Sequence, residues 1–437
     1  MANDMALITE TYVTGYSSVD SMAAIGLGQN MLVVNYPPTD VKLESLGGSS
    51  SSSSSSVAEL VWNGDGGGAD ISSDVERYLE LRGMVREATD LADSGTDVIL
   101  KLSGTSVFQA IWDHSSKVID ELRRSNPSYS KMTQEESTMS DNTEKEADSS
   151  ERRAFYGEIV GHACNYNEKK GGGSLTVVLG TVLEESEVGD AVFTMEDFGD
   201  YPEKIRERIA MLEGRGIKID EGTLQKLKIT SPVTERVTAA GLLVDTLKSL
   251  SDGHLTFRSS PKIPFTPPLD VTASLCRIGL GADITSRSCS KAAAEFGAGS
   301  LRVALCQDAD AMESSAEAVR VKACMMQGRR KKRTLAETCF RLGCVQVGAL
   351  KGSVEEVDAM MTELYDKAKE EWGAVFAEID ETRDLGKEDV EGIVAWVENE
   401  MNKVAMLDGA FEAVKDDKEG KNPDKKEKTK KAWGVRE

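Results

Sequence analysis

The chain has 437 residues, of which 40% are hydrophobic and 29% charged, so it can form two or three compact units. Its 74 acidic and 52 basic residues give a net charge of −22, which excludes a protein that is basic throughout and coats nucleic acid without specificity. No apolar run approaches the ~18 residues of a membrane-spanning helix, and the start of the chain lacks a secretory signal. We therefore expect a soluble protein with no membrane partner, whose seven scattered cysteines stay reduced.

Residues 1–124 are expected to form an N-terminal lobe. A serine-rich linker at 47–56, with eight consecutive serines, interrupts it because serine cannot bury apolar surface. Apolar spacing then predicts a helix that starts near Ser73, a short strand at 98–102 and a second helix over 107–122.

Residues 125–153 are almost without apolar side chains, so they are predicted to be a disordered linker. The next segment, 154–229, is predicted to be a small α+β unit. Its β-branched runs at 175–183 and 191–195 predict strands, and 202–212 predicts a helix.

Residues 230–415 are expected to form a helical C-terminal lobe, followed by a charged tail at 416–437. Pro232 suits the first turn of a helix, and Thr334 and Ser353 each precede a glutamate by three residues, the spacing of a capping box. The helix after Ser353 carries the longest apolar stripe, which runs from Val357 to Ile379. The predicted fold class is mainly α, with two helical lobes, a small α+β insert and disordered segments.

No motif for catalysis or cofactor binding stands out. The chain has neither G-x-x-x-x-G-K-[ST] nor G-x-G-x-x-G, and its three histidines and seven cysteines have no metal-ligand spacing. Asp197, Phe198 and Gly199 spell the kinase D-F-G without the lysine and H-R-D motifs that accompany it. We therefore expect no enzyme, no catalytic residues, no metal and no cofactor.

Positive charge is concentrated in one region. Residues 270–351 carry 13 basic and 8 acidic residues, although the whole chain is strongly acidic. Lysine and arginine side chains that neutralise phosphates release counterions, which is the main sequence-independent source of affinity for RNA. The residues expected to contact RNA are Arg320, Lys322, Arg329, Arg330, Lys331, Lys332, Arg333 and Arg341.

Two other interpretations of the basic run at 329–333 stay open at this point. It could be a solvated loop, or a nuclear-localisation signal recognised by an import receptor. The second belongs to an alternative hypothesis, a nuclear-importable interaction or regulatory protein that uses the amphipathic helix after Ser353 as its partner surface. Aromatic residues make up only 5% of the chain, so RNA contacts are expected to be with the backbone rather than with stacked bases.

Chain length, mostly helical lobes, mobile segments and a central basic region together resemble the nucleocapsid (coat) proteins of negative-strand RNA viruses, and most of all those of the plant ophioviruses. The resemblance covers the layout of the whole chain. It implies a viral nucleoprotein that self-associates into oligomers, encapsidates genomic single-stranded RNA in a basic cleft and works with the viral polymerase. The implied location is the virion and the host cytoplasm, and the import hypothesis adds the nucleus.

Overall fold

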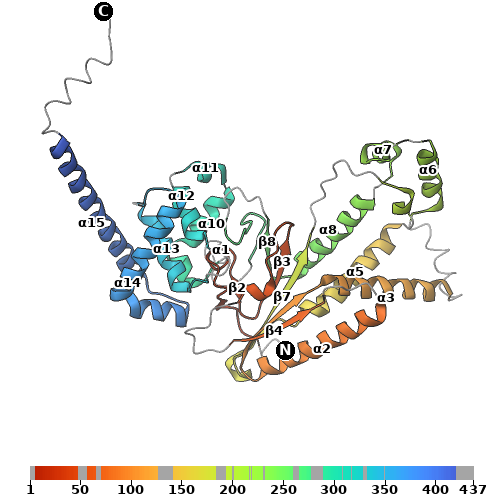
Figure 1. The fold of residues 1–437 in the computed structure, drawn as a ribbon. Helices are drawn as coiled ribbons and strands as arrows, with labels where there is room; N and C mark the ends of the chain where they lie inside the picture. Colours follow the sequence, from red (N-terminus) through yellow and green to blue (C-terminus); the bar gives the residue numbers. More distant parts are fainter. Residues whose placement is uncertain are drawn as a thin grey trace, which may run out of the picture.

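The computed structural model describes residues 5–47, 57–64, 70–125, 141–183, 193–198, 201–215, 217, 219–229, 232–258, 265–276, 289–307, 309–315, 317–327, 332–348 and 350–419. Within them, a mostly parallel β-sheet is covered by helices on both faces (Figure 1). The predicted fold class, mainly α with two helical lobes and a small α+β insert, is therefore wrong, because the core is α/β. The serine tract at 49–56 and the tail from 420 onward lie outside the described residues.

The sheet has the strand order β4-β5-β7-β3-β8, and these five strands are parallel. Their bounds are β3 (Asn30–Asn35), β4 (Ala58–Asn63), β5 (Asp97–Ser103), β7 (Ser174–Val182) and β8 (Gly253–Phe257), and a short strand β6 (Cys164–Asn165) pairs antiparallel with β7. The central strands are almost continuously apolar because both of their faces are buried. On β3, for example, Met31 and Val33 belong to one core and Leu32 and Val34 to the other.

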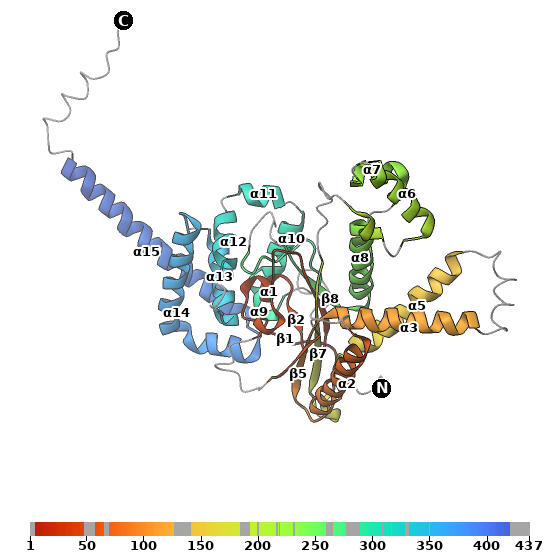
Figure 2. The same ribbon diagram turned by 45° about the vertical axis from the view of Figure 1, so that its right-hand side comes forward.

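One face of the sheet is covered by what we call the outer helical layer: α2 (Ile71–Asp93), α3 (Thr105–Ser125), α5 (Asp141–Val160) and α8 (Pro232–Leu250). These helices connect β4 to β5, β5 to β7 and β7 to β8, always in one direction along the sheet. Right-handed crossovers in one direction place their helices on one face. Helices α2 and α3 lie side by side, and the C-terminal part of α3 extends beyond the sheet together with α5 (Figures 1 and 2).

The opposite face is covered by what we call the helical lobe. It combines an N-terminal segment with the C-terminal helices in one continuous apolar core. Its elements are β1 (Thr11–Tyr12), α1 (Ser17–Met22), β2 (Ile25–Gly26), η1 (Leu43–Ser45), α9 (Lys291–Glu295), α10 (Ala298–Gln307), α11 (Ala309–Ser314), α12 (Glu317–Met325), α13 (Leu335–Val347), α14 (Val354–Thr382) and α15 (Lys387–Glu419).

The predicted starts of three helices are confirmed. Helix α8 begins at Pro232, and Thr334 and Ser353 are the N-caps of α13 and α14. Ser353 and Glu356 form the reciprocal bonds of a capping box, which pairs two backbone donors at the start of α14. The stripe on α14 is a core face rather than a partner surface, because Val357 and Ile379 at its two ends are fully buried.

A small insert lies between β7 and α8 and contains η3 (Met195–Phe198), α6 (Glu203–Gly214) and α7 (Glu221–Leu227). It has its own apolar cluster, centred on Phe198, Ile209 and Leu224. The helix predicted at 202–212 is thus present, whereas residues 193–195 form no strand.

Several other segments differ from the prediction. Residues 141–153, predicted to be part of a disordered linker, form the first part of α5, and β7 lies at the centre of the sheet instead of in a separate α+β unit. Six of the seven cysteines are buried as free thiols and Cys306 is exposed. Among the described helices, none is both long and apolar enough to cross a membrane.

Candidate functional site

The predicted RNA-contacting residues do not form an exposed cationic surface where the structure describes them. Arg329, Arg330 and Lys331 lie outside the described residues. Arg320, Lys322 and Lys332 are half-buried, whereas Arg333 is 3% exposed and Arg341 is fully buried. Arg320 donates from Nε to the carbonyl of Val345 at 3.2 Å, near the C-terminus of α13.

Arg333 closes the C-terminal end of α12. Its guanidinium donates to the carbonyl oxygens of Cys324 and Met326, both at 2.6 Å, and to the hydroxyl of Ser17 at 3.2 Å. The last carbonyls of a helix have no partner within the helix, and a cation there also interacts favourably with the helix dipole. Arg333 therefore joins α12 to the N-terminal segment.

Arg341 and Arg333 share two carboxylates. Arg341 donates to Glu337 at 3.1 Å and to Asp358 at 2.7 Å, and Arg333 pairs with the same two groups at 3.4 and 3.2 Å. A further bond runs from Arg341 to the hydroxyl of Thr362 at 2.7 Å. The four charges balance inside the lobe, and since most of the guanidinium donors are used, the two arginines are structural rather than available to phosphate.

Lys332 holds the N-terminal segment. Its ammonium donates to the carbonyl of Thr14 at 2.8 Å and to that of Ser45, and it lies 3.4 Å from the centre of the Tyr16 ring. Nearby, the buried carboxylate of Asp20 accepts bonds from the backbone N–H groups of Thr14 and Gly15. Burial raises the pKa of Asp20 to about 6 and lowers that of Lys332 to about 8.

One sequence signal pointed to this structural role. The basic run ends directly before the N-cap Thr334, and Arg333, Glu337 and Arg341 follow each other at intervals of four residues. That spacing places all three on one side of the start of α13. Sequence reasoning missed Asp358 and Ser17, since both are distant in the chain.

The carboxyl end of β3 is where the topology would place a ligand. The chain leaves β3 toward the helical lobe, through Leu43 and Leu46, whereas it leaves the neighbouring β7 toward the outer helical layer and α8. Ligands of doubly wound sheets bind in the crevice between two strands whose connections diverge in this way.

This crevice is closed by the chain itself. The Asn35 side chain donates to and accepts from the backbone of Val41, both at 3.1 Å, and so folds residues 36–41 over the strand end. The Arg258 guanidinium lies 4.4 Å from the centre of the Tyr36 ring. Residues 37 and 38 are prolines without N–H groups, and only the short 3₁₀ turn η1 follows them. A phosphate at this position would find neither a row of backbone donors nor a helix N-terminus.

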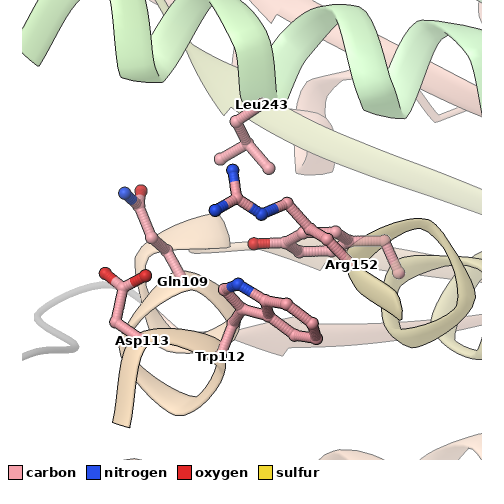
Figure 3. Close-up of a pocket in the computed structure, with 6 residues that line it drawn as sticks. Gln109, Trp112, Asp113, Arg152 and Leu243 are labelled. Atoms are coloured by element: carbon pink, nitrogen blue, oxygen red, sulfur yellow. The ribbon is translucent and has the colours of Figure 1, made fainter. Parts of the chain in front are cut away.

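A pocket of about 230 Å³ lies between α3, α5 and α8 (Figure 3). Its lining residues are Gln109, Trp112, Asp113, Arg152, Tyr156 and Leu243. The Arg152 guanidinium lies over the Trp112 ring, 5.8 Å from its centre, and burial raises the pKa of Tyr156 to about 12. The phenol is therefore neutral near pH 7. The pocket is smaller than the ~300 Å³ at which ligand sites usually begin.

Five of the twelve large apolar side chains that are exposed among the described residues lie on the outer helical layer. Val75 and Leu79 lie one turn apart on α2, and Val118 and Leu122 lie one turn apart on α3. Leu242 on α8 is also exposed. In α9–α14 and in residues 387–403 of α15, by contrast, no large apolar side chain whose exposure is described is exposed.

The net charge of the helices also differs between the helical lobe and the outer helical layer. Helix α14 carries ten acidic and two basic residues, a net charge of −8, whereas α3 carries three of each and α8 two of each. Helix α2 is intermediate, with six acidic and three basic residues. Helix α5 also carries six acidic and three basic residues. Each helix of the outer helical layer is thus less acidic than α14.

No family model matches the chain, and no curated protein matches it. Within the described part of the chain, no group of three or more histidine, cysteine, aspartate or glutamate side chains is placed to hold a metal ion.

Proposed function

We propose that the protein is a non-enzymatic assembly protein that associates with further copies of itself through the outer helical layer. The observation that carries the proposal is the pair of exposed apolar turns on α2 and α3. Exposed apolar patches on a protein surface mark interaction sites, and these two turns belong to neighbouring helices of one layer. Helices α3 and α8 have no net charge, so a second copy meets less repulsion on this side than it would at the acidic α14.

The closed crevice at β3 supports a non-enzymatic role. A doubly wound sheet offers its ligand site at that edge, and here Asn35, Tyr36 and Arg258 occupy it. The fold then serves as a rigid support for the helices on its two faces.

Sedimentation velocity over a wide range of protein concentration tests the proposal. The wild type should associate, and added salt should strengthen the association, because it screens repulsion between copies of charge −22. The variant Leu79→Glu/Leu122→Glu should stay monomeric at concentrations where the wild type associates. Leu7→Glu is the matched control, because Leu7 is 79% exposed but lies outside the layer. A wild type that stays monomeric throughout would overturn the proposal.

Binding of single-stranded RNA stays a prediction. The described members of the predicted set offer it little support, since Arg333 and Arg341 are occupied inside the helical lobe. Absorbance at 260 nm that co-purifies with the protein and is removed by ribonuclease would favour RNA binding. Nucleic-acid-free protein that associates in the sedimentation experiment would favour assembly without RNA.

A further inference from the structure

We infer that the interface between two copies is two-fold symmetric and pairs the apolar turn of α2 in one copy with the apolar turn of α3 in the other. The inference rests on the proposed function and adds which surfaces meet. The α2 turn is defined by Val75 and Leu79, and the α3 turn by Val118 and Leu122.

The two turns match in size and spacing. Leu79 is 63% exposed and Leu122 is 64% exposed, and each has a valine four residues earlier on the same helix face. Four residues correspond to about 6 Å along a helix. Two side chains of one turn can therefore pack beside two of the other, as ridges do between helices.

The arrangement of the helices favours mixed pairing. Helices α2 and α3 are neighbours in one layer, and the C-terminal part of α3 extends past the sheet (Figures 1 and 2). A two-fold axis that passes between the two turns places the α2 turn of one copy against the α3 turn of the other, and the α3 turn of the first against the α2 turn of the second. In such an interface, residue i of one copy contacts residue j of the other, and residue j of the first contacts residue i of the second. A single interface with two equivalent contacts therefore covers both turns of both copies.

Charge also separates mixed pairing from like-with-like pairing. Residues 75–80 of α2 contain two acidic residues and one basic residue, whereas α3 carries no net charge. Mixed pairing therefore brings a segment of net charge −1 against a neutral helix. Pairing α2 with α2 would instead place Glu76 and Glu80 opposite their own copies, which repel.

A charge-swap experiment tests the pairing. Leu79→Glu and Leu122→Lys should each lower the association constant at least about tenfold, the loss expected when a buried leucine is replaced by a charge. An equimolar mixture of the two variants should recover association, because glutamate at 79 meets lysine at 122 in one contact while the other contact keeps both leucines. The double variant in one chain should also self-associate, through two such ion pairs.

Sedimentation velocity reads out all four samples, with circular dichroism to confirm that each is folded. If both single variants lose association and neither the mixture nor the double variant recovers it, the mixed pairing is overturned while the proposed function stands. A wild type that never associates would overturn both. An equimolar mixture of Leu79→Glu and Leu122→Glu is the control, and it should not recover association, because glutamate at 79 would then meet glutamate at 122.

Discussion

Helices α14 and α2 are both long and both carry apolar side chains at helical spacing, yet the chain uses them in opposite ways. On α14, the stripe that includes Val357 and Met361 is buried in the core of the helical lobe, and the opposite face is strongly acidic. On α2, the core takes Leu81 and Val85, whereas Leu79 remains exposed. Periodicity shows that a helix has an apolar face but not what covers it.

The same contrast applies to charge. In the helical lobe, arginines such as Arg341 are buried and paired with carboxylates, so charge there is part of the fold. In the outer helical layer, pairs such as Arg82 with Glu158 are exposed. Removing a charge should therefore have very different consequences on the two sides of the sheet.

The largest effect is expected for Arg341→Met. It leaves Glu337 and Asp358 without one of their two buried cations, so the free energy of unfolding should fall by about 3 to 5 kcal/mol. Urea unfolding followed by circular dichroism measures the loss. Lys369→Ala removes an exposed pair with Asp366 on α14 and should cost under about 1 kcal/mol. Equal losses for both variants would contradict the buried network.

A pH-dependent effect is expected at Asp20. Its folded-state pKa of about 6 lies above the ordinary value of 3.8, so the folded protein binds the extra proton between these pH values. The contribution of this carboxyl to stability is full below about pH 4 and is lost as the pH rises to about 6, by up to about 3 kcal/mol. Asp20→Asn cannot titrate. The stability of the wild type minus that of Asp20→Asn should therefore fall across this range, and a flat difference would count against the buried carboxylate.

A smaller effect should reveal the contact between α14 and α15. A methyl group added at Gly392 would lie 2.6 Å from Cη2 of Trp372, so Gly392→Ala should cost about 1 to 2 kcal/mol despite the better helix propensity of alanine. In a Trp372→Ala background the same change should instead stabilise by up to about 1 kcal/mol. Additive effects in this double-mutant cycle would show that the ring does not pack on Gly392.

The smallest effect on stability is expected for Leu79→Glu. The side chain is exposed, so the free energy of unfolding of the dissociated protein should change by less than about 0.5 kcal/mol. Thermal unfolding in dilute solution checks this value. A loss of 2 kcal/mol or more, the usual size for a core leucine, would place Leu79 in the core and remove it from the association surface.

Local signals in the sequence predicted much of the helical lobe. Caps depend on residues three apart, so Thr334 and Ser353 marked their helices correctly. The strands β5 and β7 were also predicted, because each is a run of β-branched and apolar residues. The sheet was not, since its strands pair across long stretches of chain: β3 lies beside β7 and β8.

Two of the missed strands had weak local patterns. β4 is an edge strand whose alternate residues Glu59, Val61 and Asn63 are exposed, and β8 has only five residues, including Gly253 and His254. A third, β3, is a clear apolar run that was not predicted to be a strand. The predicted RNA-contacting residues do not form an exposed surface where they are described, and the reason for this is different. A run of arginines looks the same in sequence whether solvent or carboxylates surround it, and the partners Asp358 and Ser17 come from other parts of the chain.

Hydrogen–deuterium exchange measured at low and high protein concentration compares the two sides of the sheet in one sample. Peptides covering residues 71–80 and 113–124 should become protected as concentration rises, whereas those from α14 should not change. Protection confined to α14, or no change anywhere, would contradict an association surface on the outer helical layer.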